Sequence, residues 1–364
     1  MSRFLNSRLK DLEEYTPGEQ PTDQKYIKLN TNESPYPPSP RVVEAIGEEE
    51  VKRLRLYSDP ESRLLKAKLA ETYRVRPENV FVANGSDEIL NFAFMAYAQA
   101  GAAFPDLTYG FYRVFADLYG IPAHIVPLKE DFTMDAEAFM GREELVVIAN
   151  PNAPTGLCLE AEELEKIVAS CKGVVLVDEA YVDFGGQSAV EWIQKYANLL
   201  VVQTFSKSRS MAGARLGYAF AHESLIRDLE KIKYSTNPYN INRLTQAAGA
   251  AALEDPEYYR KNCGEIVRTR SYVKDELLKR GFTLTDSRAN FLFAASDRMD
   301  GETFYRELRK KGVLIRHFRQ DRIRNYNRIT IGSPEEMKIF LEKTDEVLAE
   351  AKKAVRPKGG SDDE

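Results

Sequence analysis

Two ionisable side chains stand at the ends of short apolar runs, where they could take part in chemistry. Asp178 ends the run GVVLVD, and Lys207 follows the run LLVVQTFS. A buried carboxylate is costly unless it is paired, which suggests a cationic ring nitrogen as a partner for Asp178. A lysine at the mouth of a cleft can form a Schiff base when burial or neighbouring charges lower its pKa. The ordinary alternatives are a cap or salt bridge for Asp178 and a solvated Lys207.

Groups suited to an anion lie close to Lys207 and at one further strand end. Ser206 precedes the lysine, and Arg215 follows it within the same segment. A hydroxyl and a guanidinium beside a lysine suit a phosphate bound next to a carbonyl group. Ser86 and Asp87 open a predicted helix, where free backbone N–H groups can also hold an anion. A helix start alone is weak evidence, because most helix starts bind nothing.

An aromatic cluster, LTYGFY, contains Tyr109. Core packing is the default role of such a ring, although one ring could stack on a flat cofactor. Pyridoxal 5′-phosphate (PLP) needs a lysine for its aldehyde carbon, a carboxylate for its ring nitrogen, an anion site and a ring face. The residues described above satisfy these needs as a group.

The composition limits the class of protein that can carry these residues. The chain has 364 residues, of which 43% are apolar and 29% are charged, enough for about two folded domains. A net charge of −5 disfavours a general nucleic-acid binder. Three cysteines and three histidines are scattered, so we expect no disulfide framework and no metal site. The charged N-terminus lacks an apolar segment, and we expect a cytoplasmic protein.

Helical patterns alternate with apolar runs through most of the chain. The segments 145–150, 173–181 and 199–206 are apolar on both faces, which is typical of parallel strands covered by helices. Helical patterns at 160–171 and 188–196 separate them, and this βαβ alternation predicts an α/β domain. Ligands bind beyond the carboxyl ends of the strands in such a sheet. The loops that carry the residues above are therefore expected to converge on one cleft.

The two ends of the chain follow other patterns. After about residue 250, long amphipathic helical stretches alternate with strand-like segments, which predicts a smaller α+β unit. The first 40 residues are rich in proline and polar residues, which excludes a regular helix or a central strand. They form either an ordered arm, which could return to the smaller unit, or a mobile tail.

An ordered set of motifs makes the sequence recognisable from about residue 15 to residue 348. The motifs are YTPG, KLNTNESPYPPSP, RLYSDP, NGSDE, NPNAPTG, VDEAY, FSKSRSMAGARLG, ANF and RITIG. In this order they resemble the fold-type I PLP-dependent aminotransferases, and within them the histidinol-phosphate aminotransferase family. The resemblance implies an α/β fold with a mostly parallel seven-stranded sheet covered by helices, beside a smaller α+β domain.

The same resemblance implies a division of the chain into four parts. Residues 1–35 would form an N-terminal arm that covers the active site. Residues 36–260 would form the large PLP-binding domain and residues 261–354 the small C-terminal domain. Residues 355–364 would form a flexible tail.

The resemblance also assigns roles to individual residues. Lys207 would form the Schiff base with the cofactor and move the substrate proton. Asp178 would keep the pyridine nitrogen protonated, and Tyr181 would hydrogen-bond the phenolic oxygen. The phosphate of the cofactor would be held by the backbone of Ser86 and Asp87, the hydroxyl of Ser206 and the guanidinium of Arg215. The face of the cofactor ring would be covered by Tyr109.

Further residues are expected to contact the substrate or a second subunit. Arg328 and Arg316 resemble the arginines that bind the carboxylate or other anionic groups of the substrate, and Tyr15 belongs to the arm over the pocket. Tyr57 matches a tyrosine that reaches the phosphate of the neighbouring subunit, which implies a homodimer. No metal, membrane or nucleic acid is expected as a partner.

One departure from the family motif affects the cofactor site. The usual loop reads NPNNPTG, and its second asparagine helps to hold the phenolic oxygen of the cofactor. Ala153 stands at that position here, so one hydrogen bond is lost unless Asn152 or a water replaces it. The chemistry should survive, because Tyr181 remains.

The resemblance predicts a reaction, with alternatives of the same fold. We expect PLP-dependent transamination of L-histidinol phosphate with 2-oxoglutarate, giving imidazole-acetol phosphate and glutamate, in histidine biosynthesis. An aromatic amino-acid aminotransferase has nearly the same motifs, and a threonine-phosphate decarboxylase shares many of them. A regulator built on this fold is less favoured, because the chain has no room for an added DNA-binding domain.

Overall fold

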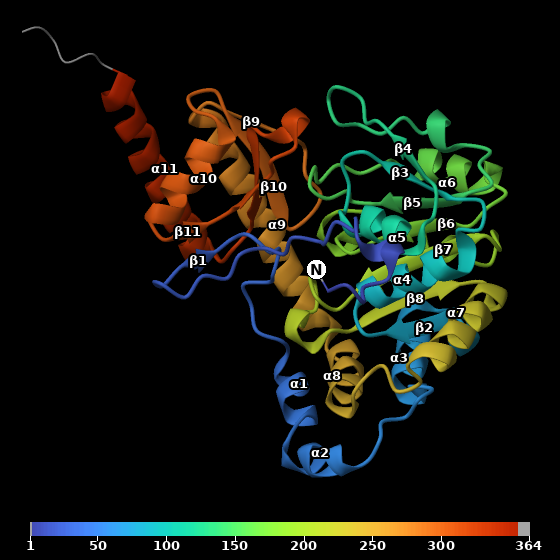
Figure 1. Ribbon diagram of the computed structural model, residues 1–364. Helices are drawn as coiled ribbons and strands as arrows, with labels where there is room; N and C mark the ends of the chain where they lie inside the picture. The colour runs from blue at the N-terminus through green and yellow to red at the C-terminus, as the bar shows by residue number, and fades with distance from the viewer. Residues whose placement is uncertain (1, 356–364) are drawn as a thin grey trace, which may run out of the picture.

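The computed structural model describes residues 2–355 and contains a seven-stranded sheet, a four-stranded sheet and an N-terminal arm between them (Figure 1). The predicted flexible tail, 355–364, lies outside the described residues except for its first residue. The predicted domain boundaries stay predictions.

The seven-stranded sheet has the strand order β2-β8-β7-β6-β5-β3-β4. Its strands are β2 (Val80–Ala83), β3 (Ala102–Pro105), β4 (Ala123–Val126), β5 (Leu145–Ala149), β6 (Val175–Asp178), β7 (Leu199–Thr204) and β8 (Gly217–Ala221). The pairings of β8 with β2 and β7 are antiparallel, and the other pairings in this sheet are parallel. The three strands predicted from their apolar runs are β5, β6 and β7, and every residue in them is buried. The mostly parallel seven-stranded sheet is therefore confirmed.

Helices cover both faces of this sheet (Figure 1). They are α3 (Arg63–Tyr73), α4 (Ser86–Tyr97), α5 (Phe111–Tyr119), α6 (Ala161–Ser170) and α7 (Glu223–Thr236). The buried side chains of α3 and α6 belong to one apolar cluster, and those of α4, α5 and α7 belong to a second cluster on the other face. Two packed faces explain why the central strands are apolar on both sides.

The helix predicted over 188–196 is wrong. That segment contains only a 3-10 turn at Val190–Trp192. The first residues of this segment are bound to Glu179 instead of starting a helix. The buried Glu179 carboxylate accepts hydrogen bonds from the Ser188 hydroxyl and the Ala189 backbone N–H. Val190 and Ile193 still reach the core, so the apolar spacing there reflects packing rather than a complete helix.

The four-stranded sheet has the order β12-β13-β10-β9, and all its pairs are antiparallel. Its strands are β9 (Phe282–Leu284), β10 (Phe291–Ser296), β12 (Arg316–His317) and β13 (Tyr326–Thr330). Long helices accompany it, namely α9 (Pro256–Lys279), α10 (Gly301–Lys310) and α11 (Pro334–Val355). The helices and strands predicted after residue 250 are confirmed, and they enclose an apolar core of their own.

The N-terminal arm is ordered and returns to this second unit, as one of the two interpretations predicts. Its short strand β1 (Ile27–Lys28) pairs in parallel with β11 (Val313–Leu314). The Thr330 N–H donates to the Leu29 carbonyl at 2.9 Å, which extends the contact to β13. The arm is thereby held where it crosses between the two sheets (Figure 1).

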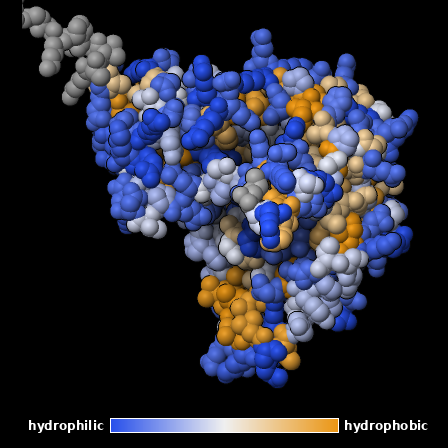
Figure 2. All heavy atoms as spheres, viewed as in Figure 1, coloured by the Kyte–Doolittle hydropathy of each residue, from blue (hydrophilic) through white to orange (hydrophobic). Residues whose placement is uncertain are grey.

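A projection at one end of the molecule carries an unusual amount of exposed apolar surface. It contains α1 (Pro40–Ala45) and α2 (Glu48–Lys52), beside α8 (Arg243–Leu253). Figure 2 shows apolar residues gathered over this projection. The exposed side chains, called here the α1–α2 patch, are Val43, Ile46, Val51, Leu54, Leu56 and Tyr57. None of the described helices is long and apolar enough to span a membrane.

Candidate active site

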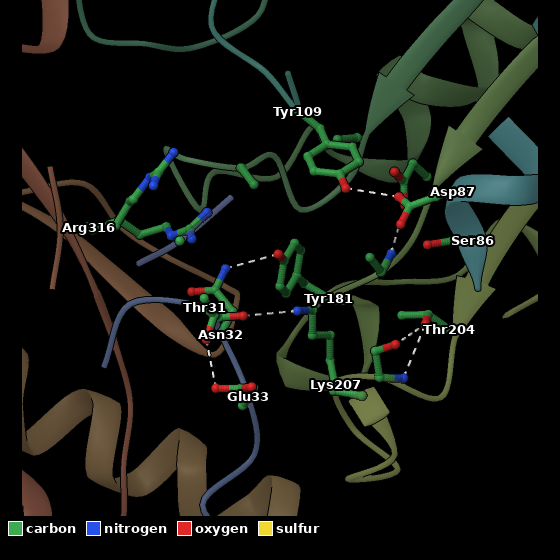
Figure 3. Close-up of a pocket in the computed structure, with 18 of the residues that line it drawn as sticks. Thr31, Asn32, Glu33, Ser86, Asp87, Tyr109, Tyr181, Thr204, Lys207 and Arg316 are labelled. Atoms are coloured by element: carbon green, nitrogen blue, oxygen red, sulfur yellow. Dashed lines mark hydrogen bonds between the residues drawn. The ribbon is translucent and has the colours of Figure 1, made fainter. Parts of the chain in front are cut away.

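A cavity of about 350 Å³ lies where the carboxyl ends of the large sheet meet the arm and the second sheet (Figure 3). Eleven of the twelve predicted site residues line it, and they are Tyr15, Ser86, Asp87, Tyr109, Asp178, Tyr181, Ser206, Lys207, Arg215, Arg316 and Arg328. Tyr57 does not. The convergence of strand ends expected from the sequence is therefore present.

Lys207 follows β7 and extends into this cavity. Its Nζ donates to the Thr31 carbonyl of the arm at 3.2 Å and lies 5.9 Å from the centre of the Tyr181 ring. Desolvation, aided by the positive charge of Arg328, lowers the pKa of Lys207 to about 8. An appreciable fraction of this amine is therefore neutral near pH 8, and a neutral amine is the form that attacks a carbonyl carbon.

Asp178 is the last residue of β6 and is only 5% exposed. The Tyr112 hydroxyl donates to its Oδ2 at 2.7 Å, and the Ala180 N–H donates to its Oδ1 at 3.1 Å. Burial raises the pKa of Asp178 to about 6, even though both hydrogen bonds favour the charged form. Among the described residues the carboxylate has no ion-pair partner, so a cation in the cavity would be stabilised beside it.

The start of α4 and the Arg215 guanidinium form a cradle for an anion. A side chain at Gly85, the residue before the helix, would place its Cβ 2.6 Å from Arg215 Nη2. A Cβ on Gly217 would lie 2.4 Å from the backbone of Gly85 and Ser86. Gly85 has a φ of +80°, which favours glycine, and the backbone contact at Gly217 leaves no room for a side chain. The guanidinium is thereby held beside the first free N–H groups of the helix, where anions bind.

Two side chains of the cradle are already hydrogen-bonded to each other. Arg215 Nη2 donates to Asp87 Oδ2 at 2.9 Å, and the Tyr109 hydroxyl donates to Asp87 Oδ1 at 2.9 Å (Figure 3). Asp87 therefore sets the position of both the guanidinium and the tyrosine ring. Ser206 lies nearby, and its N–H donates to the Thr204 hydroxyl at 3.1 Å.

The structure shows whether Asn152 can replace the missing asparagine at Ala153. Asn152 does not, because its amide donates to the Leu107 carbonyl and to Thr155, and its oxygen accepts from Thr108. A residue of the arm, Asn32, donates to the Tyr181 hydroxyl at 2.9 Å (Figure 3). The sequence motifs do not single out Asn32 as a site residue, although it lies within the NTNE segment of the arm.

Two arginines on paired strands line the opposite side of the cavity. Arg316 of β12 pairs in register with Arg328 of β13. Arg328 donates to the Asn30 carbonyl at 3.1 Å, while its buried Nε has no partner among the described residues. Arg316 donates to the carbonyls of Thr16 at 2.8 Å and Pro17 at 3.1 Å. Neither guanidinium has a carboxylate partner in the described part of the chain, so both are available to an anionic ligand.

Tyr15 places the arm over this part of the cavity. Its ring stacks on Phe111, with ring centres 4.3 Å apart, and meets Tyr109 edge-on at 6.0 Å. Tyr15 lines the cavity, where the sequence predicts it. The arm thus contributes an aromatic wall to one side of the site and Thr31 and Asn32 to the other.

Comparison with known proteins identifies the family of this site. The sequence model of the family Aminotransferase class I and II matches residues 24–343. The chain belongs to the class I and II aminotransferases. This family transfers amino groups with PLP as the cofactor, and the predicted enzyme class and cofactor are confirmed.

Individual relatives of this aminotransferase carry a more specific name. A histidinol-phosphate aminotransferase from Brachyspira hyodysenteriae is 48% identical over 94% of this chain and 98% of its own length. One from Clostridium acetobutylicum is 47% identical over 96% of this chain and all of its own. The structure of histidinol-phosphate aminotransferase from Sinorhizobium meliloti in complex with PLP matches with a TM-score of 0.81 and 24% identity, over 90% of this chain and 92% of that one. That likeness confirms the fold.

The donor set of the cavity fits the PLP of this aminotransferase family. A lysine with a lowered pKa lines the same cavity as a buried carboxylate that has no ion-pair partner within residues 2–355, and both lie beside an anion cradle at a helix N-terminus. These three features correspond to the aldehyde, the ring nitrogen and the phosphate of the cofactor. When bound, PLP supplies an electron sink for the carbanion that forms when a proton leaves the substrate Cα.

Proposed function

We propose that this aminotransferase exchanges the amino group of L-histidinol phosphate with 2-oxoglutarate, giving imidazole-acetol phosphate and glutamate, in the cytoplasm. The relatives named above support the substrate. The observation that carries the proposal is the pair Arg316 and Arg328, which lines the cavity without a carboxylate partner among the described residues. Both substrates are anions, one through a phosphate and one through two carboxylates, and two guanidinium groups can bind either.

The chain's own residues divide the chemistry among them. Lys207, as a neutral amine, would accept the proton from the substrate Cα. It would then pass this proton to C4′ of the cofactor. Its lowered pKa places this amine near the pH at which a general base is effective. Asp178 would hold the ring nitrogen in its protonated form through an ion pair. Tyr181 would donate to the phenolic oxygen.

The remaining residues would bind and orient. The phosphate of the cofactor would be held by the backbone N–H groups of Ser86 and Asp87, the Ser206 hydroxyl and the Arg215 guanidinium. Tyr109 would cover one face of the cofactor ring. Arg328 would bind the substrate carboxylate or phosphate from the other side. Tyr15 and the arm would exclude water, because they already cover the side of the cavity near Arg316.

The reaction is tested by a single half-reaction on purified, PLP-loaded protein. L-histidinol phosphate, added without a 2-oxo acid, should deplete the visible absorbance of the bound cofactor, and 2-oxoglutarate should restore it. Its phosphate carries more negative charge and one more acceptor oxygen than the carboxylate of phenylalanine, so kcat/KM should exceed that of phenylalanine by about 10-fold or more. A faster response to phenylalanine or tyrosine would instead indicate an aromatic aminotransferase. Release of CO₂ without amino transfer would indicate a decarboxylase.

We also propose that the enzyme is a homodimer in which the α1–α2 patch is covered by a second copy of the chain. Tyr57 lies in this patch, is 78% exposed, and stacks on Tyr239 with ring centres 4.5 Å apart, outside the cavity of its own chain. An apolar surface of this kind is uncommon on a monomer and marks an interaction site. Tyr57 would then reach the phosphate in the partner's cavity.

Charge placed in the patch should separate the subunits. Leu54→Asp puts a carboxylate at a side chain that is 52% exposed, and we expect it to convert a species of twice 41.3 kDa into monomers with reduced turnover. Light scattering coupled to size-exclusion chromatography measures this mass. Leu278→Asp is the matched control, because Leu278 is 49% exposed on α9 and lies outside the patch. A monomeric wild-type protein with full activity would contradict the proposal.

A further inference from the structure

Tyr181 depends on the arm for its hydrogen bond. Its ring meets Phe291 edge-on at 5.2 Å, and its hydroxyl accepts a hydrogen bond from Asn32 Nδ2 at 2.9 Å. A phenol has one proton and can accept as well as donate. Because Asn32 fills an accepting position, the proton of the Tyr181 hydroxyl is left to point elsewhere.

Asn32 itself is locked in one orientation. Its N–H donates to Thr330 Oγ1 at 2.9 Å, and the Thr330 hydroxyl donates back to Asn32 Oδ1 at 3.0 Å. Asn290 donates to the Asn32 carbonyl at 3.0 Å. With Oδ1 accepting from Thr330, the amide nitrogen is the atom that faces Tyr181.

The backbone at Asn32 gives a second sign of constraint. The residue is 1% exposed and has a φ of +55°, in the left-handed region. Asparagine is one of the few residues other than glycine that adopt this region readily. Thr31, its neighbour, accepts from Lys207 Nζ at 3.2 Å, so consecutive residues of the arm contact both Lys207 and Tyr181.

We propose that Asn32 is a positioning residue that turns the Tyr181 hydroxyl proton toward the phenolic oxygen of the cofactor. In this way it compensates for Ala153, whose methyl group cannot donate and which lines the same cavity. The inference rests on the proposed role of Tyr181. Hydrogen bonds also polarise one another, so a phenol that accepts from an amide is a stronger donor.

The test is a pH titration of the visible absorbance of PLP-loaded protein, which does not depend on turnover. A hydrogen bond donated to the phenolic oxygen of the cofactor stabilises negative charge on that oxygen. The Lys207 nitrogen attached to the cofactor is then a weaker base, and the pH midpoint of its titration is lower. Asn32→Gly keeps the backbone conformation accessible but removes the donor. We expect it to raise the titration midpoint by about 0.5 to 1 pH unit. Asn32→Asp keeps the shape and would accept the Tyr181 proton instead, so it should raise the midpoint at least as much.

Three controls separate positioning from a general loss of structure. Tyr181→Phe should raise the midpoint by itself, and adding Asn32→Gly to it should change nothing further, because the two act through one hydroxyl. Asn79→Ala removes another buried asparagine, whose amide donates to the Ala221 carbonyl at 2.9 Å, and should leave the midpoint unchanged.

The outcomes discriminate between the inference and the proposed site. A midpoint moved by Tyr181→Phe but not by either Asn32 variant overturns the inference and leaves the site intact. A further shift from Asn32→Gly in the Tyr181→Phe protein also overturns it. If Tyr181→Phe itself has no effect, both the role of Tyr181 and the inference fail.

Discussion

Replacing Lys207 with alanine is expected to lower kcat by about 10⁴-fold or more, because one amine serves both as the carbonyl nucleophile and as the proton carrier. The visible absorbance of the bound cofactor should change to that of an unattached aldehyde at the same time. Single-turnover measurements with L-histidinol phosphate give the rate, and an absorbance spectrum of the resting protein gives the attachment.

Lys195→Ala is the matched control for this variant. Lys195 is exposed, pairs with Glu165 at 2.7 Å and does not line the cavity. It should retain both the spectrum and the turnover of the wild type. Turnover by Lys207→Ala within about 10-fold of wild type would exclude Lys207 as the proton carrier.

The second large effect is expected at Asp178. Asp178→Asn keeps the size of the side chain but removes the charge that would stabilise a protonated ring nitrogen. Loss of one partner from a buried charge pair lowers kcat by about 10²- to 10³-fold. Cofactor attachment through Lys207 should persist, so the visible spectrum should be retained while the half-reaction slows. Stopped-flow absorbance measures both.

The pH dependence provides an internal check on this assignment. The pKa of Asp178 is raised to about 6 by burial, so the carboxylate is charged above about pH 6 and neutral below it. Cofactor affinity of the wild type should therefore fall as the pH decreases through about 6. Asp178→Asn should lose that dependence. Tyr112→Phe removes one donor to the carboxylate, so the fall should move to higher pH. An Asp178→Asn half-reaction as fast as the wild type would rule out the ion pair.

Much of the large sheet and its site could be predicted because both depend on local pattern. Strands buried on two faces are apolar throughout, and a polar residue that follows such a strand, as Asp178 and Lys207 do, stands at the sheet edge where ligands bind. These features need no knowledge of distant contacts. The exception was the segment 188–196, whose apolar spacing suits a helix as well as a packed turn.

The contributions of the arm and of Tyr112 could not be predicted in the same way. Asn32 reaches Tyr181 because Thr330, 298 positions away, holds it there. Nothing in the local pattern around Asn32 specifies that pairing. Tyr112 lies on the buried face of α5, where an aromatic residue is expected for packing alone. Its hydrogen bond to Asp178 emerges only when α5 and β6 are brought together.

The pairing of the arm with β11 also has a consequence for synthesis of the protein on the ribosome. Ile27 leaves the ribosome early, but its partner Val313 is made 286 positions later. At about 5–20 residues per second, the arm waits roughly 15–60 s for its strand partner. During that interval the large sheet can form while its cleft lacks the Thr31 and Asn32 contacts. Assembly of the catalytic centre is therefore among the last events of folding, and a nascent chain with a complete large sheet is still inactive.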